Sequence, residues 1–369
     1  MTIKFSNPIG GRKKPLQLSS LFLCDPDVIL KVSGLSISGV MKEAGLESIH
    51  KRVMNPVDDA AALRVAHDMS ERMPDLPKDL IAALHGDIEA QEYYEKIGAW
   101  ELFMIGHSPS EDQWPHQVKF WIAIERATDQ SWKLFHQQQY GEAVSLIIDS
   151  PLVRLLLWPE AIDILKNRTN LQELLPLRGL VALEMVLSLL AGCDAKVCHS
   201  LSRSDSLGLD VLPTTQTGNK NPTSLFFKWI KSQIGLPTIS SILNAAKATE
   251  SGLDESLLKR WSNGSHMPSE KVLRDFLEPF FDDPEAKEIW MRHYATKCLT
   301  FIGYQAQQFQ KITNAAATTD LLKGALRPWP DLPFGFTSIE TWFENRYPFW
   351  FDYHRKQIEE EGIKPSPNN

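Results

Sequence analysis

Residues 252–273 read GLDESLLKRWSNGSHMPSEKVL. This stretch contains the most specific indications of the fold in the sequence. Asp254 is a residue type that caps the first turn of a helix, because its carboxylate accepts hydrogen bonds from free backbone N–H groups. The apolar residues expected on one buried face of that helix are Leu257, Leu258 and Trp261. Gly264 is the residue type that most often ends a helix in the left-handed conformation. The stretch therefore predicts a short amphipathic helix with a defined start and end.

A second helix is predicted directly after this glycine. Pro268 and Ser269 are typical of the first positions of a helix. The apolar residues expected to point inward from this helix are Val272, Leu273, Phe276 and Leu277. Before the first helix, Gly252 permits the left-handed conformation that a tight turn requires. Two further helices are expected upstream, over residues 225–234 and 239–248.

This spacing resembles the second half of a helix-turn-helix domain of the phage Cro and repressor (XRE-like) type. That family shows an apolar residue, a tryptophan three later, a glycine three after that and a proline four further on. The matching residues are Leu258, Trp261, Gly264 and Pro268. Gly252 falls on the family's glycine in the turn between the two helices of the motif. The resemblance covers residues 223–285, and it departs from the family where Lys247-Ala248 replaces a Leu-Ala pair.

The resemblance implies a function in DNA binding. In this family the helix after the turn enters the major groove, and its exposed residues meet the edges of the bases. The candidate DNA-binding residues are Asp254, Glu255, Ser256, Lys259, Arg260, Asn263 and His266. The chain would then be a transcription-regulator-like protein whose helical remainder senses a ligand, dimerises or binds a partner.

The charge of this region favours a second hypothesis. Residues 223–295 contain nine lysines and arginines against ten acids, and the whole chain has a net charge of −7. A protein without a positive balance gains little affinity from displacing the counterions of DNA. This argues against wrapping of nucleic acid by charge alone, although it permits a small DNA-reading module. The alternative is a helical interaction or scaffold protein whose helix-turn-helix fold does not bind DNA, since a fold does not fix a function.

The rest of the chain is predicted to be mostly α-helical. Over residues 58–202, apolar residues recur at helical spacing between short polar or proline-containing breaks, as expected for a helical bundle or array. Residues 1–57 are predicted to form an irregular N-terminal arm with the basic cluster Arg12-Lys13-Lys14. Residues 203–222 are rich in Ser, Thr, Gly, Pro and Asn, which is typical of a linker. The helix-turn-helix-like helical module is expected to extend over residues 223–312.

Residues 313–369 are predicted to form a helical, aromatic-rich C-terminal cap. Ten aromatic residues fall between Trp329 and Tyr353. We expect them to pack into the core, because large aromatic side chains are mostly buried. A partner-binding groove is the alternative, since aromatic anchors dominate interfaces. A patch on a membrane surface is disfavoured, because lysines and arginines are few here and the acids would repel anionic lipid.

No motif of known catalytic mechanism occurs in the chain, so no enzyme, catalytic residue or cofactor is predicted. A metal site is one interpretation of the group Cys193, Cys198 and His199. Zinc sites usually combine two close pairs of ligands, and the sequence has no second Cys/His pair near this one. We expect no metal there and reduced thiols throughout. No apolar run is long enough to span a bilayer, and a cytoplasmic location is expected. The candidate partners are duplex DNA, another protein or a second copy of the chain, and not a membrane.

Overall fold

The computed structural model describes residues 116–167, 171–218, 220–247, 254–283, 286–318 and 332–360, with isolated positions nearer the N-terminus. These ranges contain helices, turns and irregular segments but no β-strand, which confirms the predicted all-α fold class. The predicted N-terminal arm, apart from Ile3 and Phe5, lies outside the described residues, as does Gly252. No helix in the described ranges is long and apolar enough to cross a membrane.

The chain divides into two compact units, which we describe separately. One unit contains residues 18–31 and 35–155, and the other contains residues 1–17, 32–34 and 156–369. Residues 58–202, predicted as the helical body, include parts of both units.

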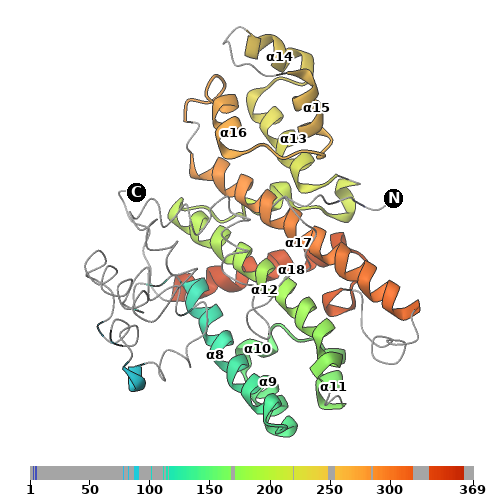
Figure 1. Ribbon diagram of the computed structural model, residues 1–369. Coiled ribbons are helices and arrows are strands. Elements are labelled where there is room, and N and C mark those ends of the chain that lie inside the picture. The colour runs from blue at the N-terminus through green and yellow to red at the C-terminus, as the bar shows by residue number, and fades with distance from the viewer. Residues whose placement is uncertain are drawn as a thin grey trace. The chain divides into compact units, whose positions relative to one another are not determined.

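The unit that ends at residue 155 contains a helical hairpin (Figure 1). Its described helices are α8 (His116–His136), α9 (Tyr140–Asp149) and the short α10 (Pro151–Arg154). Helices α8 and α9 pack against each other through apolar residues at helical spacing. A buried hydroxyl also joins them, because Ser131 Oγ donates to the carbonyl of Ala143 at 2.7 Å.

The other unit is built on three long helices and the short α11 (Pro159–Asn167). The long helices are α12 (Leu171–Ser200), α17 (Lys287–Thr318) and α18 (Ile339–Glu360). Helix α12 packs against both α17 and α18. Every residue from 181 to 190 is buried, including Glu184 and Ser188, so neighbouring segments cover this part of α12 on all sides. Below, these three helices are called the bundle (Figure 1).

The aromatic C-terminal segment packs into this bundle. The short helix η4 (Pro333–Gly335) precedes α18. The buried aromatic residues of α18 are Trp342, Phe343, Tyr347, Trp350 and Phe351. Core packing is therefore confirmed for these residues, whereas Phe349 is 38% exposed and Trp329 lies outside the described residues.

Residues 201–221 join α12 to α13 and are called the strap below. They include the short helices η2 (Gly208–Val211) and η3 (Thr215–Thr217). The composition of this segment predicts a linker, yet its apolar residues Leu207, Val211 and Leu212 are fully buried. The strap therefore contributes to the core of the unit while it connects the two helices.

Four short helices follow the strap and are called the module (Figure 1). They are α13 (Pro222–Ile234), α14 (Ile239–Lys247), α15 (Glu255–Ser262) and α16 (Glu270–Leu277). Leu258, Trp261 and Leu273 are at most 1% exposed, which confirms that they are buried. The Trp261 ring packs edge-on against Phe276, with centroids 5.3 Å apart, and against Phe227 at 6.0 Å. Helix α17 begins inside the predicted module and continues past its predicted end at residue 312.

The ends of α15 and α16 follow the sequence prediction. Asp254 accepts a hydrogen bond from the backbone N–H of Leu257 at 2.5 Å, and Ser269 caps α16 in the same way. Gly264 follows the end of α15 with a φ of +71°. The prediction that Val272 points inward is wrong, because its side chain is 37% exposed. The buried face of α16 is the one that carries Leu273, and Val272 lies one residue away from it.

Candidate nucleic-acid interface

The predicted DNA-binding residues all lie on the surface of the module. Asp254, Glu255, Ser256, Lys259, Arg260, Asn263 and His266 are all exposed. Those from residue 255 to residue 263 recur at intervals that place them on one side of α15. The opposite side of α15 carries Leu258 and Trp261, which hold it against the module core. The arrangement presents one polar helical surface on a firmly packed support.

Several of these side chains already have partners within the chain. Lys259 Nζ lies 2.6 Å from Glu255 Oε1, one helical turn earlier. Asn263 Oδ1 accepts a hydrogen bond from the backbone N–H of Ser265 at 2.9 Å. The side chains of Arg260 and His266 make no hydrogen bond or ion pair with any described residue. The guanidinium of Arg260 and the imidazole of His266 are therefore available to contact a ligand.

Charge is distributed unevenly along α15. The carboxylates of Asp254 and Glu255 lie at its start, where the helix dipole stabilises negative charge. The cations Lys259 and Arg260 lie in its last turn. Glu255 partly neutralises Lys259, so Arg260 carries most of the uncompensated positive charge of the helix. Phosphate groups would therefore favour the end of α15 and the following turn over its start.

The start of α13 supports the end of α15. Asn221 caps α13 by accepting from the backbone N–H of Ser224 at 3.0 Å, and its Nδ2 donates to the carbonyl of Gly264 at 3.0 Å. Ser224 Oγ donates to the carbonyl of Ser262 at 2.7 Å. These bonds satisfy carbonyl groups that the end of a helix leaves without partners. Sequence reasoning placed Asn221 in the linker, although the pair Asn221-Pro222 is a helix-start signal.

A buried carboxylate joins α12 and α18 inside the bundle. Glu184 is fully buried and accepts from the indole N–H groups of Trp342 and Trp350, each at 2.6 Å. Arg346 Nε donates to the same carboxylate at 2.7 Å. These partners all belong to the same unit as Glu184. Glu184 therefore stabilises the bundle, and sequence reasoning did not single it out.

A second buried carboxylate, Asp194, fastens the strap to α12. It accepts from Ser206 Oγ at 2.5 Å and from the backbone N–H groups of Leu207 and Gly208, each at 3.1 Å. Tyr347 of α18 donates its hydroxyl to the same carboxylate at 2.9 Å. Burial raises the pKa of Tyr347 well above its usual value, so this phenol remains a hydrogen-bond donor.

The cysteines considered as metal ligands belong to α12. Cys198 Sγ donates to Asp194 Oδ1 at 3.4 Å and to the carbonyl of Asp205 at 3.2 Å. Burial, followed by the charge of Asp194, raises the pKa of Cys198 to about 12. Its thiol is therefore protonated at neutral pH and is a poor nucleophile. Among the described residues, no group of three His, Cys, Asp or Glu side chains could hold a metal ion.

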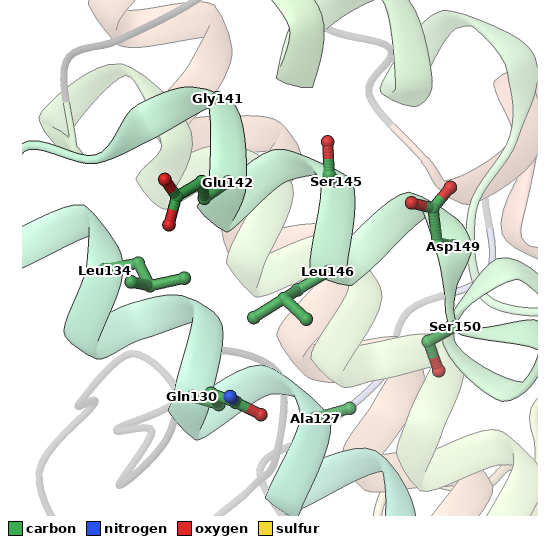
Figure 2. A pocket seen from close by; sticks show the side chains of 9 residues that line it. All are labelled: Ala127, Gln130, Leu134, Gly141, Glu142, Ser145, Leu146, Asp149 and Ser150. Carbon is green, nitrogen blue, oxygen red and sulfur yellow. The ribbon is translucent and has the colours of Figure 1, made fainter.

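An open groove of about 860 Å³ lies along the hairpin of α8 and α9 (Figure 2). Its lining includes the apolar side chains Ala127, Leu134 and Leu146. Glu142 and Asp149 provide the carboxylates, and both belong to α9. The lining contains no histidine, cysteine or lysine, and its other polar side chains are Gln130, Ser145 and Ser150.

No protein-family model matches the chain, and no curated protein or solved structure shows a significant similarity to it.

Proposed function

We propose that the protein is a DNA-binding, transcription-regulator-like protein in which α15 enters the major groove. The observation that carries this proposal is the division of α15 into two sides. One side is buried through Leu258 and Trp261, and the other exposes the polar residues from Ser256 to Asn263. A short helix that is anchored on one side and polar on the other is what major-groove recognition requires.

Arg260 is the residue that we expect to contribute most to base recognition. Its guanidinium has five N–H donors, which suit bidentate contact with the major-groove edge of guanine. Asn263 and His266 are exposed in the turn and irregular segment that follow the end of α15. The carboxylates at the start of α15 would disfavour phosphates and could accept a hydrogen bond from cytosine.

The test is selection of bound duplexes from a random-sequence pool with the full chain, followed by titration of the selected duplex. Arg260→Ala should weaken its binding roughly tenfold or more, because it removes one bidentate base contact. Lys196→Ala is the matched control, since Lys196 is an exposed cation on α12, outside the module. We expect this variant to bind like the wild type.

An equal loss of duplex affinity in Arg260→Ala and Lys196→Ala would indicate that the chain binds DNA by charge alone. That result would contradict the proposed role of α15. Failure to enrich any duplex would favour the scaffold hypothesis. The basic cluster Arg12-Lys13-Lys14 could add affinity that does not depend on sequence. Removing residues 1–15 separates that contribution, and preference for the selected duplex should survive the truncation.

One observation favours the scaffold function as a second candidate. The ion pair between Glu255 and Lys259 lowers the positive charge of the exposed side of α15. A surface with little net charge is better suited to contact with protein than with phosphate.

A further inference from the structure

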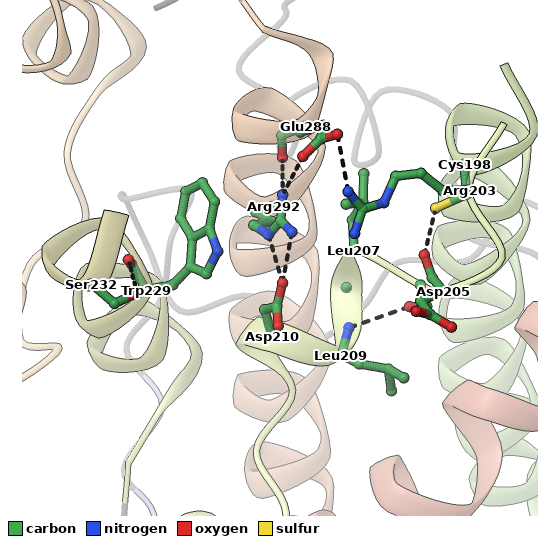
Figure 3. A network of polar contacts seen from close by, with 12 residues as sticks. Cys198, Arg203, Asp205, Leu207, Leu209, Asp210, Trp229, Ser232, Glu288 and Arg292 are labelled. Carbon is green, nitrogen blue, oxygen red and sulfur yellow. Dashed lines mark hydrogen bonds and ion pairs between the residues drawn. The ribbon is translucent and has the colours of Figure 1, made fainter. Parts of the chain in front are cut away.

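The strap connects the bundle to the module through a buried arginine. Arg292 belongs to α17, and its side chain is only 5% exposed. It donates through Nε to Asp210 Oδ2 at 2.8 Å, and its Nη2 lies 2.7 Å from the same oxygen. Asp210 belongs to η2 of the strap. A charged contact from the strap thus reaches into the first turns of α17 (Figure 3).

The same guanidinium also contacts the module. Its carbon lies 4.2 Å from the ring centroid of Trp229, which belongs to α13. Its Nη1 donates to the carbonyl of Glu288 at 3.0 Å. Figure 3 shows Trp229, Asp210 and Glu288 placed around the arginine. One buried cation therefore joins the strap, α17 and the module, and we call this arrangement the Arg292 clasp.

Glu288 extends the clasp to the end of α12. Arg203, which follows α12 in the strap, pairs with Glu288 Oε1 at 3.1 Å, while Glu288 Oε2 lies 3.7 Å from Arg292 Nη1. Asp194 fastens the adjoining part of the strap to α12 and α18, as described above. The strap is thus fixed to α12 and α18 through residues 206–208, and to the start of α17 through Arg203 and Asp210.

We propose that the strap is a conformational coupling element, which fixes the orientation of the module on the bundle through the Arg292 clasp. Asp210 is the strap's charged partner for a nearly fully buried guanidinium. Without it, the buried guanidinium keeps only Glu288 as a charged partner, at 3.7 Å, so we expect Arg292 to rearrange and the strap to lose one of its attachments to α17. A change in the bundle would reach α15 by this route. Only the consequence for DNA binding rests on the proposed function.

Hydrogen exchange of the full chain, measured by mass spectrometry, tests the coupling. Asp210→Asn should speed exchange roughly tenfold or more in strap residues 206–213 and α17 residues 287–294. Exchange in α15 residues 258–262 should remain unchanged, because the aromatic core of the module stays intact. Asp205→Asn is the matched control, since Asp205 is an exposed acid of the same strap and, among the described residues, its carboxylate accepts only from the neighbouring Ser204.

Unchanged strap exchange in Asp210→Asn would overturn the proposal, as would an equal change in Asp205→Asn. Arg203→Gln is a milder variant, because it removes only a half-exposed ion pair with Glu288. Arg203→Gln should speed hydrogen exchange in the same regions as Asp210→Asn, but by a smaller factor. A uniform increase in exchange over the whole chain in both variants would also overturn the coupling.

Coupling must be reciprocal, so binding at α15 should in turn slow exchange in the strap. Addition of the selected duplex should therefore protect the strap in the wild type but not in Asp210→Asn. Binding without any protection of the strap would contradict the coupling. Absence of duplex binding by the wild type would contradict the proposed function. The hydrogen-exchange comparison of the free wild type, Asp210→Asn and Asp205→Asn would still test the clasp.

Discussion

At the scale of single residues, Trp261 contributes to the module through apolar packing. Its indole nitrogen is buried and makes no hydrogen bond with the described residues. Two aromatic rings, Phe276 and Phe227, contact its ring edge-on. Such contacts add to the free energy gained by burying a large apolar surface.

Trp261→Ala should destabilise the module by about 3–5 kcal/mol, because it leaves a cavity among these rings. Urea unfolding followed by circular dichroism measures the loss. Val272→Ala is the control within the module, since Val272 is 37% exposed, and should change the free energy of unfolding by about 0.5 kcal/mol or less. Equal stability of the two variants would show that Trp261 does not anchor α15.

Two constraints favour glycine at position 264, a positive φ and a close side chain, and comparison with Gly235 separates them. Gly264 has a φ of +71°, and Gly235 at the end of α13 has a φ of +73°. A Cβ at Gly264 would collide with the side chain of Asn221, whereas a Cβ at Gly235 would meet nothing within 4 Å. Gly235→Ala should therefore cost about 1 kcal/mol for backbone strain alone. Gly264→Ala should cost at least about 1 kcal/mol more, because Asn221 must also give up its hydrogen bonds. Equal losses in the two unfolding experiments would argue against the contact with Asn221.

His293 makes stability depend on pH at the joint between α17 and the module. Its Nε2 lies 3.3 Å from the carbonyl of Pro268, and its ring packs against Phe226. Burial, followed by the charge of Lys297, lowers its pKa from 6.5 to about 4. The unfolded chain therefore takes up this proton at a higher pH than the folded chain. The corresponding stability is lost as the pH falls from 6.5 to about 4, by about 3 kcal/mol at most.

His293→Gln should flatten this part of the pH dependence. Urea unfolding of both proteins across the same pH range measures the difference. Identical slopes in the variant and the wild type would show that other groups cause the acid sensitivity.

At the scale of the elements, the bundle depends on polar contacts as well as apolar ones. The carboxylate of Glu184 accepts two indole N–H groups and the guanidinium of Arg346. Glu184→Gln replaces one acceptor with an NH₂ group that faces a donor and removes the charge opposite Arg346. We expect a loss of about 3 kcal/mol or more in the free energy of unfolding, as for other broken buried ion pairs.

Glu359→Gln is the control on the same bundle, because the Glu359 side chain is 59% exposed and its ion pair with Arg355 contributes little. Urea unfolding of the two variants compares them directly. A Glu184→Gln protein as stable as Glu359→Gln would contradict the role given to the buried carboxylate.

The elements also show which features a sequence reveals. Helices α15 and α16 follow from local signals, since Asp254, Gly264 and Ser269 act within a few residues of their own position. The indole partners of Glu184, Trp342 and Trp350, lie 158 and 166 residues away along the chain. No local sequence pattern can therefore predict these hydrogen bonds. The wrong prediction for Val272 has a different cause. Apolar spacing locates the buried face of a helix only to within about one residue, and Val272 lies at the edge of that face. The strap has the composition of a linker, yet its packing depends on Asp194 of α12, 13 residues before Leu207, and on Tyr347 of α18, which shares that carboxylate.

At the scale of the whole molecule, the polar side of α15 belongs to a module that the strap joins to a helical bundle. The proposed function assigns DNA reading to α15, and the proposed coupling assigns to the strap the transfer of the state of the bundle to the module. The all-α fold class and the exposure of the candidate residues were predictable, since both follow from helical periodicity. The division of the chain at residue 155 was not, because it depends on contacts that the sequence pattern does not specify.

Photocross-linking of the full chain to random-sequence duplexes that carry 5-iodouracil tests the role of α15 most directly. Mass spectrometry of the digested complex identifies the peptides attached to DNA. We predict that cross-linked peptides include residues 254–266, and that Arg260→Ala reduces their yield while Lys196→Ala does not. Cross-links confined to other regions, such as the basic cluster Arg12-Lys13-Lys14, would contradict the assignment of α15 as the DNA-reading helix.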